Sequence, residues 1–286
     1  METTARRGRA ALGRGALLAL AALALAACSE TLGSFTPAVN HVAEVDADSS
    51  AAPGNIASLT DVIQRNPNDS AAYNTRGIAY AKSGRYQNAI DDFTKAVQID
   101  PKFGAAYTNR ALAYRQIDKD GLALADFSSA IAANPNDVAA YLGRGNLERA
   151  HGHFPEAMAD LDTVIRLNPE GAQAYHARGL IFQRQGDHAQ AITDFGNAID
   201  RDPFAAAPYQ ARGESLIATG KYDAAVEDFN AALNVDSSNA EAWAGLGVAY
   251  ERLGNKAKAI ESYQRATMVS PNNATALAGL KRLGSA

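Results

Sequence analysis

The chain contains very little cysteine, since Cys28 is the only one among 286 residues. A single thiol cannot form a disulfide within the chain, and it cannot supply the several thiolates of a structural zinc site. Aromatic residues are also few, at 7% of the chain. Charged residues make up 20%, which is ordinary for a globular protein and excludes a highly charged disordered chain.

The chain also lacks an excess of positive charge, because its formal net charge is −4. Nucleic-acid-binding proteins present basic surfaces to phosphates, and no basic tract or nucleic-acid-binding motif is present in this sequence. The sequence has no glycine-rich phosphate loop, no nucleophile elbow and no motif that pairs catalytic carboxylates. We therefore predict no nucleic-acid partner, no catalytic residue, no cofactor and no enzymatic activity.

The most apolar stretch lies near the N-terminus, from Ala16 to Ala27, after a basic segment that ends at Arg14. This layout is typical of a secretory signal, and the apolar run is too short to span a bilayer. The run ends in Leu25-Ala26-Ala27-Cys28, which resembles the lipobox of bacterial lipoproteins. The resemblance implies a signal peptide over residues 1–27, cleavage before Cys28 and acylation of its sulfur. An alanine-rich signal with an incidental cysteine is the alternative.

Residues 28–54 are rich in Ser, Ala, Asp and Pro and have no sustained hydrophobic period. We predict that this segment is a flexible tether with a mean reach of roughly 25–30 Å. Ser29 follows the cysteine, and a residue other than Asp at this place implies, by resemblance to lipoproteins of two-membrane bacteria, transfer to the outer membrane. The expected location is the periplasmic face of the outer membrane, with the inner membrane left open.

Residues 70–273 repeat themselves with a period of 34 residues and no insertion. The six cycles begin at Ser70, Gly104, Val138, Ala172, Ala206 and Ala240. Within each cycle, position 4 is Tyr or Trp, position 8 is Gly or Ala, position 20 is Ala, and position 24 is Phe, Leu or Tyr. These spacings place the apolar residues on one face of each of two helices. Glycine at position 15, with Asp118 as the exception, predicts a left-handed residue that ends the first helix, and proline at position 32 ends the second.

This pattern resembles the tetratricopeptide repeat (TPR) over residues 70–273. The resemblance implies an all-α fold, an α-solenoid of six helical hairpins in a right-handed superhelix. Because an end hairpin exposes an apolar face, we expect a cap at each end. We predict an N-terminal capping half-repeat over residues 55–69, with Leu59, Val62 and Ile63 at positions 24, 27 and 28 of a truncated cycle. We predict a C-terminal capping helix over residues 274–286, with Leu277 and Leu280 facing back.

Arginine at position 7 and aspartate at position 23 occur together in five cycles and disappear together in the sixth, where Leu246 and Ser262 replace them. This joint loss favours structural ion pairs within each hairpin over a ligand-binding row of arginines. The predicted pairs are Arg76 with Asp92, Arg110 with Asp126, Arg144 with Asp160, Arg178 with Asp194, and Arg212 with Asp228.

In TPR proteins the first helices line a concave face at positions 2, 5, 9, 12 and 13, and this face binds ligands. The resemblance implies that the partner-binding groove contains Asn74, Lys82, Thr108, Arg115, Gln116, Asn146, Arg149, His176, Gln183, Arg184 and Gln210. The same face becomes acidic at Glu214, Glu241 and Glu251. His151 and His153 lie in a turn near Glu156, and we expect them to be solvated with no metal bound.

These features together favour a membrane-tethered adaptor that binds envelope proteins or peptides on its concave face. The repeats and lipobox resemble those of NlpI-type lipoproteins, which implies a role in envelope integrity or in scaffolding peptidoglycan enzymes. A pilotin-like or outer-membrane-assembly lipoprotein is the alternative within the adaptor class. A glycan-binding module or an enzyme is the alternative from other classes, and a homodimer is left open.

Overall fold

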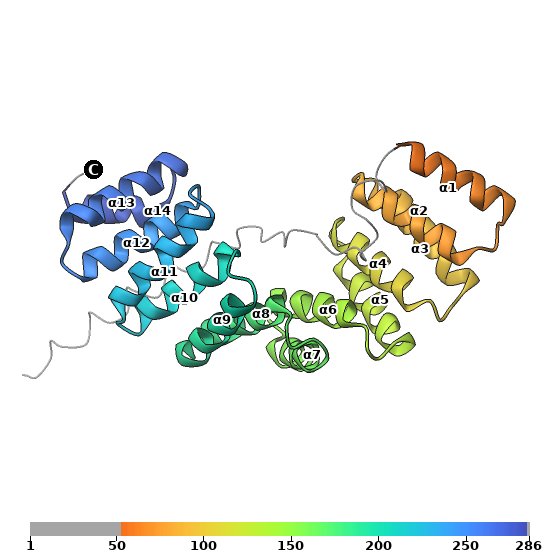
Figure 1. Ribbon diagram of the computed structural model, residues 1–286, viewed down its shortest axis with the longest axis horizontal. Coiled ribbons are helices and arrows are strands. Elements are labelled where there is room, and N and C mark those ends of the chain that lie inside the picture. The colour runs from red at the N-terminus through yellow and green to blue at the C-terminus, as the bar shows by residue number, and fades with distance from the viewer. Residues whose placement is uncertain (1–52, 285–286) are drawn as a thin grey trace, which may run out of the picture. The chain divides into compact units, whose positions relative to one another are not determined.

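The structure is a computed structural model that describes residues 53–284, in which all regular elements are α-helices (Figure 1). The signal peptide, Cys28 and the predicted tether as far as residue 52 lie outside the described residues. The helices are α1 (Pro53–Arg65), α2 (Ser70–Lys82), α3 (Tyr86–Ile99), α4 (Gly104–Arg115), α5 (Asp120–Ala133), α6 (Val138–Ala150), α7 (Phe154–Leu167), α8 (Ala172–Arg184), α9 (His188–Arg201), α10 (Ala206–Ala218), α11 (Tyr222–Val235), α12 (Ala240–Arg252), α13 (Lys256–Val269) and α14 (Ala274–Arg282). Among them no helix is long and apolar enough to cross a membrane.

The predicted helix ends are confirmed by the backbone geometry. The five glycines at position 15 have φ between 74° and 81°, and Asp118 takes the same place with φ 55°. Asp69, Asp137, Asn239 and Asn273 precede first helices and accept a hydrogen bond from a backbone N–H of the first turn. The last described glycine, Gly284, also has a positive φ and follows the capping helix. Each cycle therefore folds as two helices joined by a tight turn.

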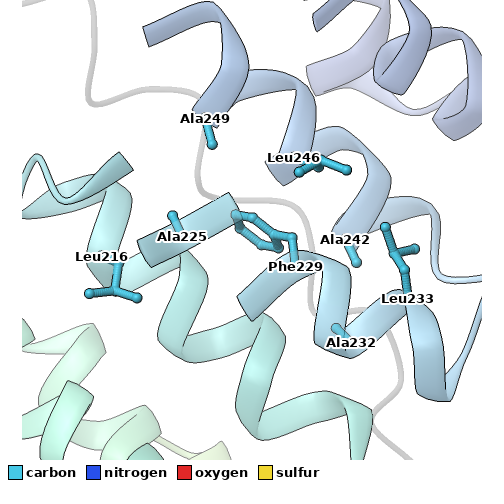
Figure 2. Close-up of a cluster of buried hydrophobic side chains, with 8 residues drawn as sticks. All are labelled: Leu216, Ala225, Phe229, Ala232, Leu233, Ala242, Leu246 and Ala249. Atoms are coloured by element: carbon cyan, nitrogen blue, oxygen red, sulfur yellow. The ribbon is translucent and has the colours of Figure 1, made fainter. Parts of the chain in front are cut away.

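The aromatic or aliphatic residue at position 24 is fully buried in every hairpin, and Phe229 and Tyr263 pack against glycines from both sides. A Cβ added to Gly213, at position 8 of the same hairpin, would lie 2.9 Å from the ring of Phe229. A Cβ on Gly245, at position 6 of the next hairpin, would overlap the same ring. Figure 2 shows Phe229 at the centre of the cluster that joins α10, α11 and α12. The small residues at these two positions thus allow the hairpins to stack closely.

Successive first helices contact each other, whereas successive second helices do not come into contact within residues 53–284. The six first helices and α14 therefore lie on the inner side of the stack. We call the surface formed by α2, α4, α6, α8, α10 and α12 the first-helix face. This arrangement fits the α-solenoid that the repeat pattern predicts.

Both capping helices are present, but two of their apolar residues point away from the stack. Ile63 and Leu280 are buried as predicted, at 7% exposure each. Val62 is 42% exposed and Leu277 is 46% exposed, so the prediction that Leu277 faces back on the stack is wrong. The reason is that each occupies a position that packs on the other helix of its own hairpin, and a half-repeat has no such helix.

Candidate functional site

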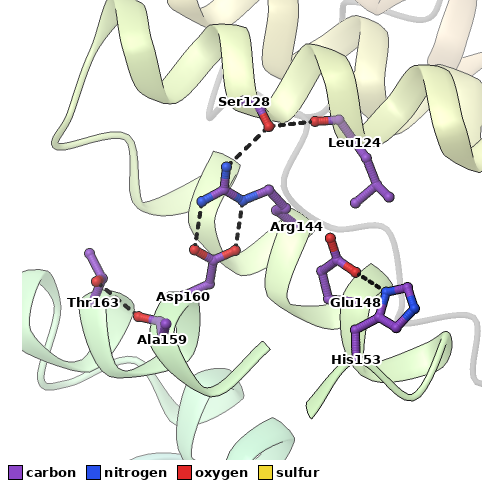
Figure 3. Close-up of polar contacts among 8 residues, drawn as sticks. All are labelled: Leu124, Ser128, Arg144, Glu148, His153, Ala159, Asp160 and Thr163. Carbon is purple, nitrogen blue, oxygen red and sulfur yellow. Dashed lines mark hydrogen bonds and ion pairs between the residues drawn. The ribbon is translucent and has the colours of Figure 1, made fainter. Parts of the chain in front are cut away.

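The five arginines at position 7 form ion pairs with the aspartates of their own hairpins. In each pair Nε and Nη2 donate to the two carboxylate oxygens at 2.6–2.9 Å, as Figure 3 shows for Arg144 and Asp160. The five aspartates are buried. Their hydrogen bonds raise the pKa of each arginine, despite the opposing effect of burial. These arginines are therefore neutralised within the fold and join first helix to second.

Four of these arginines make a third hydrogen bond, which links neighbouring hairpins and which the sequence pattern did not predict. The Nη1 atom of Arg144 donates to Ser128 Oγ at 3.1 Å, and Ser128 lies in the second helix of the preceding hairpin (Figure 3). The other acceptors lie at the same place, 16 residues before the arginine: Thr60 for Arg76, Thr94 for Arg110, and Asp162 for Arg178. These acceptors all stand at position 25 of their cycles. The repeat pattern does not reveal them, because Thr, Ser and Asp are different residue types although each has a side-chain oxygen that accepts a hydrogen bond.

Two residues assigned to the groove are buried in contacts between hairpins. Asn74 is 8% exposed and accepts a hydrogen bond from Asn109. Thr108 is 4% exposed and donates to Asp137, the N-cap of α6. Both side chains are buried and hydrogen-bonded to the following first helix or its N-cap, so they offer little surface to a partner.

Gln183 and Gln210 are partly exposed, yet both are also used between hairpins. Gln183 Nε2 donates to the Ala211 carbonyl and to Ser215 Oγ, both at 3.1 Å. Gln210 accepts from Asn239, the N-cap of α12, at 2.8 Å. These amides position neighbouring first helices, and they leave less hydrogen-bonding capacity for a ligand than the sequence suggested.

Arg115 and Arg149 differ from the structural arginines. They occupy position 12 in adjacent hairpins, at the ends of α4 and α6, and both are partly exposed. Within residues 53–284 neither guanidinium forms a hydrogen bond or an ion pair, and Arg149 Nε is buried without an acceptor. Burial lowers the pKa of both arginines, the charge of Asp120 partly opposes this for Arg115, and Arg115 lowers the pKa of Arg149 further. Two cations therefore lie close together, and neither forms an ion pair with a carboxylate within residues 53–284.

His176 follows these arginines along the first-helix face, and its ring lies 5.8 Å from that of Phe195. Burial and the nearby Arg149 lower the pKa of His176 to about 4, so this imidazole is neutral at pH 7. The other predicted groove residues remain accessible. Lys82 and Asn146 are partly exposed, and Gln116 and Arg184 are exposed.

The opposite end of the first-helix face is acidic. Glu214 and Glu241 are exposed, and Glu214 accepts hydrogen bonds from Gln183 and Gln210. Glu251 is engaged in the fold, because it accepts hydrogen bonds from Arg282 of α14 and from the Tyr263 hydroxyl. The face is thus positive near α4 and α6 and negative near α10 and α12.

Helical hairpins that repeat every 34 residues and stack through small residues define an α-solenoid of the protein-interaction type. The chain belongs to the tetratricopeptide-repeat family, whose profiles match residues 70–103, 108–159, 142–206 and 211–274. TPR repeats typically serve as scaffolds for protein–protein interaction. A comparison with curated protein sequences found no match.

Several solved structures share this fold. The type IV pilus biogenesis factor PilW is 18% identical with a TM-score of 0.65, covering 74% of this chain and 98% of that chain. YrrB, described as a TPR protein with an unusual peptide-binding site, is 24% identical with a TM-score of 0.57, covering 66% of this chain and 97% of that one. A chain of the APC/C hetero-tetramer Cut9–Hcn1 is 22% identical with a TM-score of 0.67. The match covers 79% of this chain but only 45% of the Cut9–Hcn1 chain.

Proposed function

We propose that the chain is a lipid-anchored adaptor of the cell envelope that binds an acidic segment of a partner protein on its first-helix face. The observation that supports this most directly is the contrast between the two kinds of arginine. Five arginines are neutralised by ion pairs with aspartates, whereas Arg115 and Arg149 are partly buried and form no ion pair within residues 53–284, where the charge of Asp120 acts on Arg115 without a hydrogen bond. A cation in such a place destabilises the free protein, and a bound carboxylate would offset that cost through charged hydrogen bonds.

The charge pattern also suggests the kind of ligand. Arg115 and Arg149 occupy equivalent positions in adjacent hairpins, so they should lie roughly 10 Å apart, which is one helix spacing. Charges at this separation act jointly within about one Debye length at physiological salt. An extended peptide with carboxylates at one end, or with a free C-terminus there, would match this pair, and its other end would extend toward Glu214 and Glu241.

The binding proposal is tested by reversing the two charges. Arg115→Glu with Arg149→Glu should weaken capture of envelope partners at least tenfold and abolish its salt dependence, while helicity stays near wild type. The matched control is Lys95→Glu with Lys256→Glu, which changes net charge equally at exposed positions on second helices. Unchanged affinity in the arginine variant across a salt series would place recognition elsewhere on the surface.

The anchor proposal depends on Cys28 and is tested separately. Two or three acyl chains hold a protein on a membrane far more firmly than one. Cys28→Ser should therefore abolish acyl attachment and release the body from the outer-membrane fraction. Retention of this variant in the membrane, or a cysteine without acyl chains in the wild type, would contradict the lipoprotein assignment.

Within the envelope we favour the role that the likeness to NlpI-type lipoproteins suggests, which is scaffolding of peptidoglycan enzymes. The alternative is a pilotin-like or outer-membrane-assembly role, in keeping with the structural likeness to PilW. Cross-linking of the anchored chain in intact cells, followed by identification of captured proteins, separates these roles. A zymogram and a glycan pull-down on the purified chain test the enzyme and glycan-binding alternatives.

A further inference from the structure

The turn between α6 and α7 gathers two histidines and two carboxylates. His151 and His153 flank Gly152, whose φ of 80° fixes the turn. His153 Nδ1 lies 2.7 Å from an oxygen of Glu148, which is in the last turn of α6 (Figure 3). His151 Nε2 lies 2.8 Å from Asp120, the first residue of α5 in the preceding hairpin.

This cluster breaks the repeat pattern in one hairpin only. Glu148 stands at position 11, where the other cycles carry Tyr80, Tyr114, Phe182, Leu216 and Tyr250. Its side chain is only 16% exposed, so a carboxylate has replaced an apolar group in a largely buried place, which is costly unless the charge is used. The same hairpin is also the only one with histidine at both position 14 and position 16.

The separations suit a small divalent cation. One ligand atom each from Glu148, His151 and His153 lies within 4.8 Å of the others. Zinc bonds to imidazole nitrogen and carboxylate oxygen are about 2.0–2.2 Å, which puts ligand atoms of a tetrahedral site roughly 3.3–3.5 Å apart. Small torsions of the two exposed histidines would close this gap, because the turn backbone already places them on the same side as Glu148.

We propose that Glu148, His151 and His153 bind one zinc ion and that Asp120 completes the site through His151. A histidine that binds a metal commonly holds a carboxylate on its other ring nitrogen, and this second contact orients the ring. Because Asp120 belongs to α5, the ion would cross-link the second and third hairpins. The sequence-based expectation of solvated histidines with no metal would then be replaced by a structural zinc site.

Zinc titration by calorimetry tests the proposal on the full-length chain carrying Cys28→Ser and no polyhistidine tag, because a free thiolate or a tag would also bind zinc. We expect one ion per chain and a cobalt derivative with the visible absorption of a tetrahedral site. His151→Ala with His153→Ala should weaken binding at least a hundredfold, and Asp120→Asn about tenfold to a hundredfold. The control His188→Ala alters a histidine near the next turn and should leave the affinity unchanged.

Three results would overturn the assignment. No binding by the parent chain would remove the site altogether. Parent-like binding by the double histidine variant, with circular dichroism confirming that it is folded, would place the ion elsewhere. Parent-like affinity in Asp120→Asn would refute the link between the second and third hairpins. Loss of partner capture in the Arg115 and Arg149 variant has no bearing on these outcomes, so the two proposals fail independently.

Discussion

The repeated arginine network contains one natural gap, and filling it should stabilise the protein. Arg212 bonds its aspartate as the other four arginines do, but its Nη1 atom has no side-chain acceptor 16 residues earlier, where Gly196 stands in α9. A Cβ built on Gly196 would lie 3.5 Å from Arg212 Nη1, which is ordinary contact and leaves room for a hydroxyl. We therefore expect Gly196→Ser to form the bond that Ser128 makes with Arg144.

The size of this effect follows from two terms. Glycine is about 1 kcal/mol worse than alanine in a helix interior, and serine lies about halfway between them, so Gly196→Ala should stabilise by about 1 kcal/mol and serine by about 0.5 kcal/mol from propensity alone. The new hydrogen bond to a charged donor should add about 1–1.5 kcal/mol to the serine variant. Serine should therefore exceed alanine at residue 196 by about 0.5–1 kcal/mol.

Residue 230 provides the matched control. Asn230 occupies the same position in α11, but the residue 16 later is Leu246, which has no donor. At this site serine should be about 0.5 kcal/mol less stable than alanine, because only helix propensity differs. Urea unfolding of the four single variants measures both differences. If alanine is more stable than serine at both residues, the third hydrogen bond does not contribute and the reasoning is refuted.

Three further predictions concern packing, pH and the ion pairs. Gly245→Ala should destabilise by about 1–3 kcal/mol in urea unfolding, because its methyl group would overlap the buried ring of Phe229; an unchanged midpoint would show that the ring can move. Because the folded pKa of His176 is about 4 and the unfolded value is about 6.5, the unfolded chain binds more protons between these values, so stability should fall as the pH drops through this window. The loss from pH 7 to pH 5 should be on the order of 1–2 kcal/mol greater in wild type than in His176→Asn, and equal losses would contradict it. Asp160→Ala should cost about 1–3 kcal/mol by leaving Arg144 without a carboxylate, and Arg144→Leu with Asp160→Ser should recover much of this in thermal melts; a double variant as unstable as the sum of the single variants would show no interaction.

Contacts that recur within every hairpin could be predicted from the sequence, because the same residue types stand at the same positions in several cycles. The turn glycines and Asp118 could be placed correctly since a left-handed residue is needed at the same point in each cycle. The pairing of Arg144 with Asp160 could be read from the joint replacement by Leu246 and Ser262 in the sixth cycle. Such features need no knowledge of how neighbouring hairpins approach each other.

Contacts between hairpins were harder to predict, because helical periodicity describes one helix and not its neighbour. Asn74 and Thr108 occupy polar positions on the first-helix side, so periodicity placed them on the surface. Both are buried, and their polar atoms pair with Asn109 of the following first helix and with Asp137, the N-cap of the next one. The acceptor at position 25 escaped notice for a related reason, since its partner lies in a different cycle.

Positions at which one or two hairpins differ from the other cycles indicate candidate binding residues. Position 12 is arginine in two adjacent hairpins only, Arg115 and Arg149, and the other cycles carry Ala, Gln, Ile or Glu there. A structural requirement common to all hairpins would not produce such a local pair, and within residues 53–284 neither arginine forms an ion pair. The same logic applies to Glu148, which replaces an apolar residue in one cycle beside two histidines. Residues that every hairpin shares therefore stabilise the solenoid, and the residues that break the pattern, at a cost to stability, are where ligand binding should be sought.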